Sequence, residues 1–295
     1  MTRLLLVIGL LTAWAPPAGA QDTPRPIGTL ARIQATGTIT LGVRDSALPF
    51  SYRLADGSPA GYAVDLCKAL TDDVSAALNR QPIRIAYKTV TAEDRIDKVA
   101  SGDVDIECGS TTRNKQRLER VAFSPVFFIA GTKLLVSRES PILSYKDLRG
   151  KTVVVTSGTT NETAMHVLVE RLVVHTTIVT APNHTESFAM LRAGQADAFA
   201  TDDVLLAGLA ATYDGQDYHV VGDYLSYEPY GLMYRKDEPA FAAVVEHGFR
   251  RLAEAGRLAD MYNRWLVRRL PTGEKLNIPM SAELAELFRE LGQPD

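Results

Sequence analysis

The sequence VDIECGSTTRNKQR (104–117) begins as an apolar strand and continues into a loop of small hydroxyl residues that is followed by an arginine. The strand end leaves backbone groups free, the loop adds the Ser110 carbonyl and the Thr112 hydroxyl, and Arg117 adds a guanidinium. Carbonyl and hydroxyl oxygens accept hydrogen bonds from an ammonium, and a guanidinium forms two parallel bonds to a carboxylate. This stretch therefore predicts one half of a site for a zwitterion such as an amino acid.

A second hydroxyl-rich loop, Thr156–Thr160, also follows an apolar strand and opens a helix whose first turn contains Asn161 and Glu162. The start of a helix favours an anion, because its backbone N–H groups are free and its dipole is positive there. Ser157 or Thr160 is equally suited to be a plain N-cap, and capping does not exclude binding. We expect the two loops to lie in different lobes and to hold a ligand from both sides.

Short β-rich runs alternate with helical patterns along the chain, and this βαβ order restarts after Gly150. It predicts an α/β fold with two units, each a parallel-type sheet with helices on its faces. The predicted strands are 38–43, 83–90, 104–106, 152–155, 176–180 and 196–200, and the predicted helices are 62–78, 93–100, 161–173, 185–191 and 203–211.

Two extended apolar stretches, 127–136 and 230–234, connect the two units and each contains a glycine. They predict a two-lobed, hinged protein with its ligand between the lobes, at the carboxyl ends of the strands. We expect lobe 1 from residues 21–128 and 231–270, lobe 2 from 129–230, hinge strands near 127–132 and 227–232, and a C-terminal extension, 271–295, that packs on lobe 1 with a helix near 282–291.

The first 20 residues have the pattern of a cleaved signal peptide: Arg3, an apolar run from Leu4 to Trp14, and the small residues of Ala18–Ala20. An apolar run of this length is too short for a membrane span. We therefore expect an exported protein that is soluble after cleavage. The net charge of −3 argues against a nucleic-acid binder.

The chain contains two cysteines, Cys67 on a predicted helix and Cys108 at a predicted strand end. An exported protein with an even cysteine count is free to form a disulfide, and two buried free thiols are the alternative. We favour the bridge. Two distant cysteines without clustered histidines do not have metal-ligand spacing, so no metal site is expected.

Five segments together resemble one known family: 42–52, 61–66, 107–112, 156–160 and 201–203. The chain is similar to the periplasmic substrate-binding proteins of polar amino-acid ABC transporters, and most closely to their glutamate/aspartate-binding branch. This resemblance implies a type II, Venus-flytrap fold in the periplasm and a monomer without cofactor or catalytic residues. It also implies an acidic amino acid as ligand and a membrane permease as partner.

The resemblance also implies roles for the residues that hold the backbone of the amino acid. Arg117 matches the arginine that binds the α-carboxylate, helped by Thr160. Ser110, Thr112 and Asp202 match the groups that accept from the ammonium. Asp203 competes with Asp202, since adjacent residues point in different directions and one of them is expected to be only a helix cap.

Three further residues are implied for the side-chain carboxylate: Arg44, Arg95 and His184. Arg95 has Asp94 and Asp97 as alternative partners, and a histidine near a helix start is often an ordinary surface residue. Ala92 stands where relatives often have a serine, which leaves the order of glutamate and aspartate open. The rival function is an exported cyclohexadienyl dehydratase on the same scaffold, because fold alone does not settle function.

Overall fold

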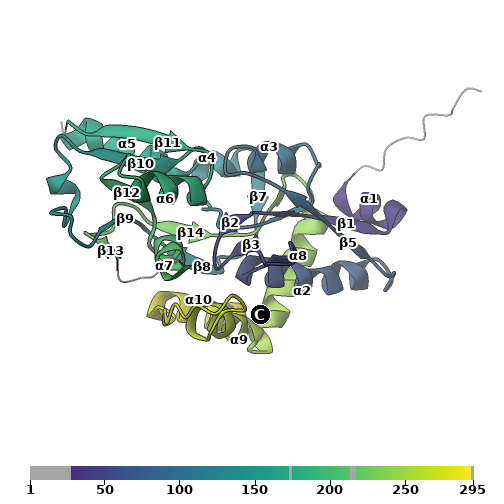
Figure 1. Ribbon diagram of the computed structural model, residues 1–295. Helices are drawn as coiled ribbons and strands as arrows, with labels where there is room; N and C mark the ends of the chain where they lie inside the picture. Colours follow the sequence, from purple (N-terminus) through teal and green to yellow (C-terminus); the bar gives the residue numbers. More distant parts are fainter. Residues whose placement is uncertain (1–27, 173–174, 213–216, 294–295) are drawn as a thin grey trace, which may run out of the picture.

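The computed structural model describes residues 28–172, 175–212 and 217–293, and its two main sheets lie side by side (Figure 1). The first sheet has the order β5-β1-β6-β15-β7. Three adjacent strands are parallel, with β5 (Arg84–Thr89) at the edge of the sheet, β1 (Thr38–Val43) next to it and β6 (Ile106–Cys108) at the centre. β7 (Val121–Phe123) and β15 (Met233–Arg235) complete the sheet, with β15 antiparallel to both of its neighbours.

The second sheet has the order β11-β10-β12-β9-β13. β10 (Thr152–Thr156), β11 (Thr177–Ala181) and β12 (Ala198–Asp202) are parallel, whereas β9 (Thr132–Ser137) is antiparallel to β12 and to β13 (Tyr218–Val221). In each sheet, therefore, the three strands on one side are parallel, and the two on the other side pair in antiparallel fashion. The α/β, two-lobed fold class expected from the sequence is confirmed.

Helices cover both sheets. The first sheet carries α1 (Thr29–Thr36), α2 (Tyr62–Ala77), α3 (Arg95–Ala100) and α4 (Lys115–Leu118), and the second carries α5 (Thr160–Leu172), α6 (His184–Arg192) and α7 (Asp203–Thr212). α2 buries Leu66, Leu70 and Val74, which lie on one face because their spacing is three or four residues. These residues pack against α8 (Pro239–Glu254), whose own buried face includes Phe241 and Phe249.

Two antiparallel strands, β8 (Phe128–Ala130) and β14 (Glu228–Tyr230), run between the sheets and pair with each other. β8 and β14 lie in the ranges near which the hinge strands were expected, 127–132 and 227–232. An aromatic cluster packs beside them, in which the Phe50 ring lies 5.1 Å from the ring of Tyr230 and 4.9 Å from that of Phe128. The exact lobe boundaries proposed from the sequence stay a prediction.

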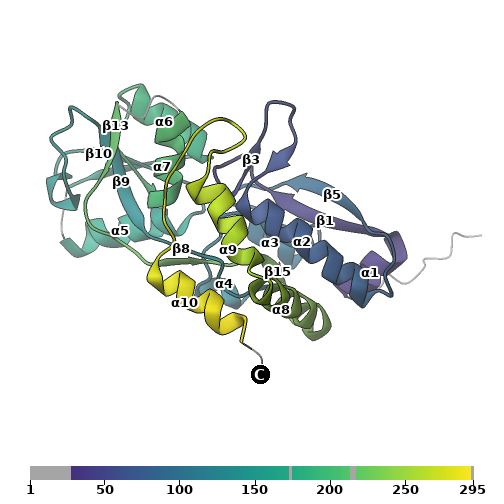
Figure 2. The same cartoon turned by 90° about the horizontal axis from the view of Figure 1, so that it is seen from below.

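After α8 the chain forms α9 (Arg257–Tyr262), a short π-helical turn (Asn263–Val267) and α10 (Ala282–Leu291). Figure 2 shows α10 beside α9 and below β8. The Ser281 hydroxyl caps α10, which buries Leu284 and Phe288 against α8 and α9. The bounds of α10 are those expected from the sequence.

Several short elements had no clear signal in the sequence: α1, β7, β13, and a three-stranded sheet of β2 (Ser46–Ala47), β3 (Ser51–Arg53) and β4 (Pro59–Ala60). The strand expected at 104–106 begins two residues later, at Ile106. The predicted signal peptide lies outside the described residues. Within the described ranges, no helix combines the length and the apolar character that a membrane span requires.

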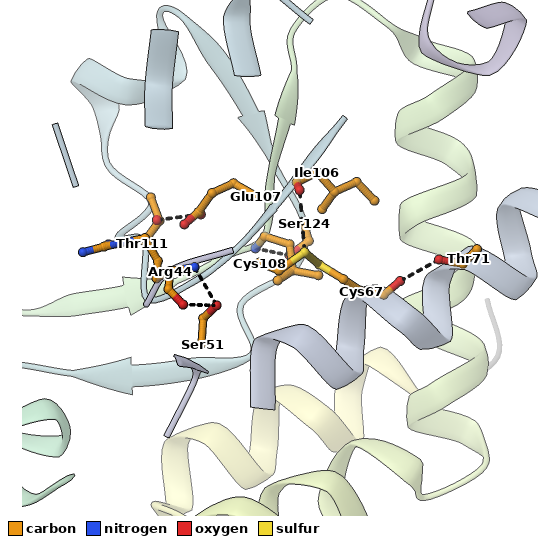
Figure 3. Close-up of a disulfide and its surroundings, with 10 residues drawn as sticks. Arg44, Ser51, Cys67, Thr71, Ile106, Glu107, Cys108, Thr111 and Ser124 are labelled. Atoms are coloured by element: carbon orange, nitrogen blue, oxygen red, sulfur yellow. Dashed lines mark hydrogen bonds between the residues drawn. A yellow bond between two sulfur atoms is a disulfide. The ribbon is translucent and has the colours of Figure 1, made fainter. Parts of the chain in front are cut away.

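Cys67 of α2 and Cys108 at the end of β6 form a disulfide, as the sequence indicated (Figure 3). Both residues are fully buried. The bridge fastens α2 to the strand end that leads into the hydroxyl loop, so it fixes the base of the candidate site.

Candidate functional site

The carboxyl ends of β1 and β6 lie side by side, because Val43 is in register with Cys108. Arg44 follows the first strand, and the loop that contains Ser110 and Thr112 follows the second. Parallel register thus brings two segments that are far apart in the sequence to one edge of the first sheet. This is the edge at which the sequence predicted half of the site.

Three arginines, Arg44, Arg95 and Arg117, are buried here, with at most 6% of each exposed. Nη1 of Arg95 donates to the Thr111 hydroxyl at 2.7 Å and to the Ser110 carbonyl at 3.2 Å. Nη1 of Arg117 donates to the carbonyl of Thr112 at 2.9 Å. Both guanidiniums are therefore anchored on the hydroxyl loop.

The two acids that were considered as surface partners of Arg95 are paired with other residues. Asp94 pairs with Lys98 at 2.6 Å and Asp97 pairs with Arg120 at 2.5 Å, so neither acid is the partner of Arg95. Arg117 of α4 is buried, whereas Arg120, which follows this helix, is at the surface.

The guanidiniums lie in an environment that disfavours their charge. Burial, and then the positive charge of Arg95, lower the pKa of Arg44 to about 10 and that of Arg117 to about 9. Nη1 of Arg44 and Nε of Arg95 are buried and have no hydrogen-bond partner within the described residues. A buried donor without a partner costs free energy. An anion that binds there would supply the hydrogen-bond acceptor that these donors lost when they were removed from water.

A buried carboxylate, Glu107, lies among these arginines and was not singled out from the sequence. Its Oε2 accepts from the Thr111 hydroxyl at 2.7 Å, and its charge raises the pKa of Arg44 and of Arg95. A Cβ at Gly109 would lie 2.2 Å from Oε1 of Glu107, so only glycine leaves room for this side chain. The sequence signal that could have identified Glu107 is its position as an acidic residue at the end of an apolar strand.

The opposite side of the site is formed by the carboxyl ends of the second sheet. Asp202 ends β12, is 3% exposed, and accepts from Nδ2 of Asn161 at 2.7 Å and from the Tyr230 hydroxyl. Burial, and then the charge of Glu228, raise the pKa of Asp202 to about 7, although its hydrogen bonds act in the other direction.

Asp203 points elsewhere. Its Oδ2 accepts from the Tyr224 hydroxyl at 2.9 Å, and its Oδ1 faces the backbone N–H of Gly131 at 3.4 Å. It is the first residue of α7. Asp202 is therefore the acid that lies within the buried cluster.

His184, the first residue of α6, is 2% exposed and is not a surface residue. Its Nδ1 lies 2.8 Å from the Thr156 hydroxyl, which is also 2.8 Å from that of Ser187. Burial, and then the charges of Arg44 and Arg95, hold the pKa of His184 well below its usual range. The ring is therefore neutral, and it lies close enough to Arg44 and Arg95 for their charges to act on it.

The N-cap of α5 is Thr159, not Ser157 or Thr160, because its Oγ1 accepts from the N–H of Glu162 at 3.2 Å. Thr160 is thus free for another role. Its hydroxyl donates to Oε2 of Glu228 at 2.7 Å and lies 3.3 Å from the hydroxyl of Thr112. The two hydroxyl loops are thus in contact through Thr112 and Thr160. Glu228, Asn161 and Tyr230 were not foreseen.

The lobes are closed on each other. A Cβ at Gly158 would lie 2.6 Å from Cα of Glu93, so the second lobe touches the backbone before α3. Two cavities flank this contact: one of about 290 Å³ beside Arg44 and Asn183, and one of about 260 Å³ beside Arg117 and Thr160. The structure therefore brings all the predicted site residues to one interlobe region, where their contacts with a ligand stay predictions.

Residues 39–268 match the bacterial extracellular solute-binding proteins, family 3. The chain belongs to this family. A relative from Pseudomonas aeruginosa, an L-glutamate/L-aspartate-binding protein, is 41% identical over 88% of this chain and 87% of its own length. A glutamate/aspartate import solute-binding protein from Salmonella typhimurium is 36% identical over 98% of this chain and 96% of its own length.

A solved structure agrees with the two-lobed fold. It is that of an ancestral amino acid-binding protein described as a precursor of cyclohexadienyl dehydratase. The TM-score is 0.70 and the identity 28%, over 81% of this chain and 99% of the other. The type II periplasmic-binding-protein fold expected from the resemblance is thus confirmed.

Proposed function

We propose that the protein captures an acidic amino acid, L-glutamate or L-aspartate, between its lobes and presents it to the permease of an ABC importer. The observation that carries this proposal is the set of three buried guanidiniums, Arg44, Arg95 and Arg117, opposite the buried carboxylate of Asp202. An acidic amino acid has two carboxylates and one ammonium, which suit such a set. The names of the two relatives support the same ligand class.

Charge explains why an acid is preferred to its amide. A hydrogen bond that involves a charged group contributes roughly 1.5 to 3 kcal/mol, and a buried charge left without a partner costs at least as much. Glutamine would place a neutral amide before Arg44 and Arg95. We expect glutamine to bind at least ~10-fold more weakly than glutamate, which corresponds to ~1.4 kcal/mol.

Calorimetry of the protein from residue 21 onward, with glutamate, aspartate and glutamine, tests this proposal. Arg44→Met is the decisive variant, since its Nη1 has no hydrogen-bond partner within the described residues and the substitution removes mainly charge. We expect its preference for glutamate over glutamine to disappear. Arg84→Met, at an exposed position of β5, is the matched control and should keep the preference. Equal affinity of the unsubstituted protein for glutamate and glutamine would contradict the proposal.

We further propose that the protein acts without covalent chemistry, as a periplasmic monomer. The binding-protein names of both relatives support the first point. The leader pattern at 1–20 and the disulfide, which suits an oxidising compartment, support the periplasmic location. Light scattering would test the monomer.

The second candidate function is a cyclohexadienyl dehydratase, because the chain is similar in structure to a precursor of that enzyme. Incubation with prephenate separates the two functions. We expect no phenylpyruvate to form, and its appearance at a rate proportional to protein concentration would favour the enzyme.

A further inference from the structure

The carboxylate of Glu228 collects hydrogen bonds from three segments of the chain. It lies on the crossing strand β14 and is 3% exposed. Its Oε1 accepts from the hydroxyl of Ser226 at 2.5 Å. Its Oε2 accepts from the hydroxyl of Thr112 at 2.6 Å and from that of Thr160 at 2.7 Å.

The two threonines on Oε2 come from opposite sides of the site. Thr112 follows β6 of the first sheet, and its backbone forms a bridge with Tyr230. Thr160 begins α5 beside the second sheet. One carboxylate oxygen on the hinge therefore joins both lobes through charge-assisted hydrogen bonds, which are about twice as strong as neutral ones.

These bonds fix the direction of both hydroxyls. A hydroxyl has one proton to donate, and both protons are directed at Glu228. Only the lone pairs of each hydroxyl oxygen are then available to a ligand. Lone pairs accept hydrogen bonds and repel the oxygens of a carboxylate. A carboxylate could receive no proton from either hydroxyl, whereas an ammonium would find two acceptors.

We propose that Glu228 is a positioning residue that turns Thr112 and Thr160 into acceptors, so that the closed site selects ligands with an α-ammonium. This inference rests on the proposed function and deepens it. It also changes one expectation from the family resemblance: the Thr160 hydroxyl serves the ammonium, and only the backbone at the start of α5 is left to serve the α-carboxylate.

The test compares L-glutamate with glutarate, which keeps the carbon chain and both carboxylates but lacks the ammonium. Calorimetry measures the ratio of their affinities in the unsubstituted protein and in Glu228→Gln. An amide at this position donates as well as accepts, so the threonine protons are released to turn into the site. We expect the preference for L-glutamate to shrink by at least about 10-fold in the variant.

Two further variants make the result specific. Glu283→Gln is the matched control. Glu283 belongs to α10 and accepts from the hydroxyl of Tyr227 at 2.6 Å. Tyr227 directly precedes Glu228, but the Glu283 carboxylate lies outside the site. We expect it to leave the ratio unchanged. Thr160→Val removes the acceptor while it keeps the shape, so it should lower the ratio, and Thr160→Ser should restore it. These two variants test the idea even if Glu228→Gln does not fold.

A purely structural latch would weaken both ligands equally. An unchanged glutamate-to-glutarate ratio in Glu228→Gln, or in Thr160→Val where the first variant does not fold, would overturn this inference alone. Failure of the unsubstituted protein to bind any acidic amino acid would overturn the proposed function and this inference with it.

Discussion

The two sides of the interlobe site are built on the same plan but from different chemistry. Both place polar residues after the carboxyl ends of parallel strands, β1 and β6 in one sheet and β10 and β12 in the other. The first side contributes the three buried guanidiniums and the carboxylate of Glu107. The second contributes Asp202, the neutral His184 and the start of α5.

This difference suggests a division of labour. The guanidiniums attract an anion through charge, which acts over several ångströms and is strong where water is excluded. We expect the short-range acceptors and backbone groups of the second side to reach a ligand only when the lobes are closed. The first side should therefore determine most of the affinity, and the second the closure and the choice of ligand.

The largest effect is expected when the guanidinium of Arg117 is removed from the first side. We expect Arg117→Ala to weaken glutamate binding by about 1000-fold or more, since a carboxylate left without its buried partner costs roughly 3 to 5 kcal/mol. Calorimetry measures the loss. Arg120→Ala, whose partner Asp97 is at the surface, is the control and should bind normally. A loss below about 10-fold in Arg117→Ala would move the α-carboxylate to another group.

The disulfide belongs to the first side alone, so its removal should affect the two lobes unequally. Cys67 and Cys108 are 41 residues apart in sequence. Closing a loop of this length contributes about 4 kcal/mol by the chain-entropy model. We expect Cys67→Ala with Cys108→Ala to lose stability of that order, as measured by denaturant unfolding.

Hydrogen exchange locates the disulfide effect. Protection should fall in α2 and β6, while β10 and β12 keep theirs as internal controls. Equal loss of protection in both sheets would show that the lobes unfold as one cooperative unit.

The sequence predicted the parts of the molecule that depend on local pattern. Most strands of the two parallel groups and most helices followed from apolar periodicity. The rule that parallel strands end at one edge placed each hydroxyl loop at the carboxyl edge of its sheet. Arg117 was recognised because a strand, a hydroxyl loop and an arginine follow each other within a few residues.

What the sequence could not show depends on long-range partners. Glu228 is followed by a proline on a short crossing strand, and nothing near it indicates that Thr112, 116 residues earlier, directs its proton there. Glu107 looked like part of the loop motif, but its position among arginines is set by strand register. The choice of Asp202 over Asp203 depended on which of the two acids turns toward Asn161.

Substitution of Gly158 tests whether binding depends on the contact that the second side makes with the first. It has φ +73°, and a Cβ there would meet the backbone of Glu93. Gly150 has the similar value of +71°, but a Cβ there would meet nothing within 4 Å. Gly158→Ala and Gly150→Ala therefore share the backbone strain, and only the first prevents full closure.

Relative to Gly150→Ala, we expect Gly158→Ala to bind glutamate about 30-fold more weakly, because overpacking costs roughly 2 kcal/mol. Small-angle scattering with saturating ligand should show a larger radius of gyration for Gly158→Ala. Equal affinities of the two variants would mean that binding does not require this contact.

The smallest effect expected is a pH dependence that originates in Asp202. Its pKa in the folded protein, about 7, is above the ordinary value of 3.8. The folded state without ligand therefore holds this proton more tightly than the unfolded chain does, and its stability should fall as the pH rises from about 4 to about 7. Binding has the opposite sign, since an ammonium needs the ionised carboxylate.

Glutamate affinity should consequently rise by about 10-fold between pH 6 and pH 8, as one titrating group with this pKa requires. The pKa values of Arg44 and Arg117, about 10 and about 9, lie above this range and that of His184 lies below it. Asp202→Asn should bind more weakly and lose the pH dependence of both binding and stability. Calorimetry and denaturant unfolding at three pH values measure the two opposite slopes. If the affinity of the unsubstituted protein did not change with pH, Asp202 would not be a partner of the ammonium. The second side would then contribute only hydroxyl and backbone contacts.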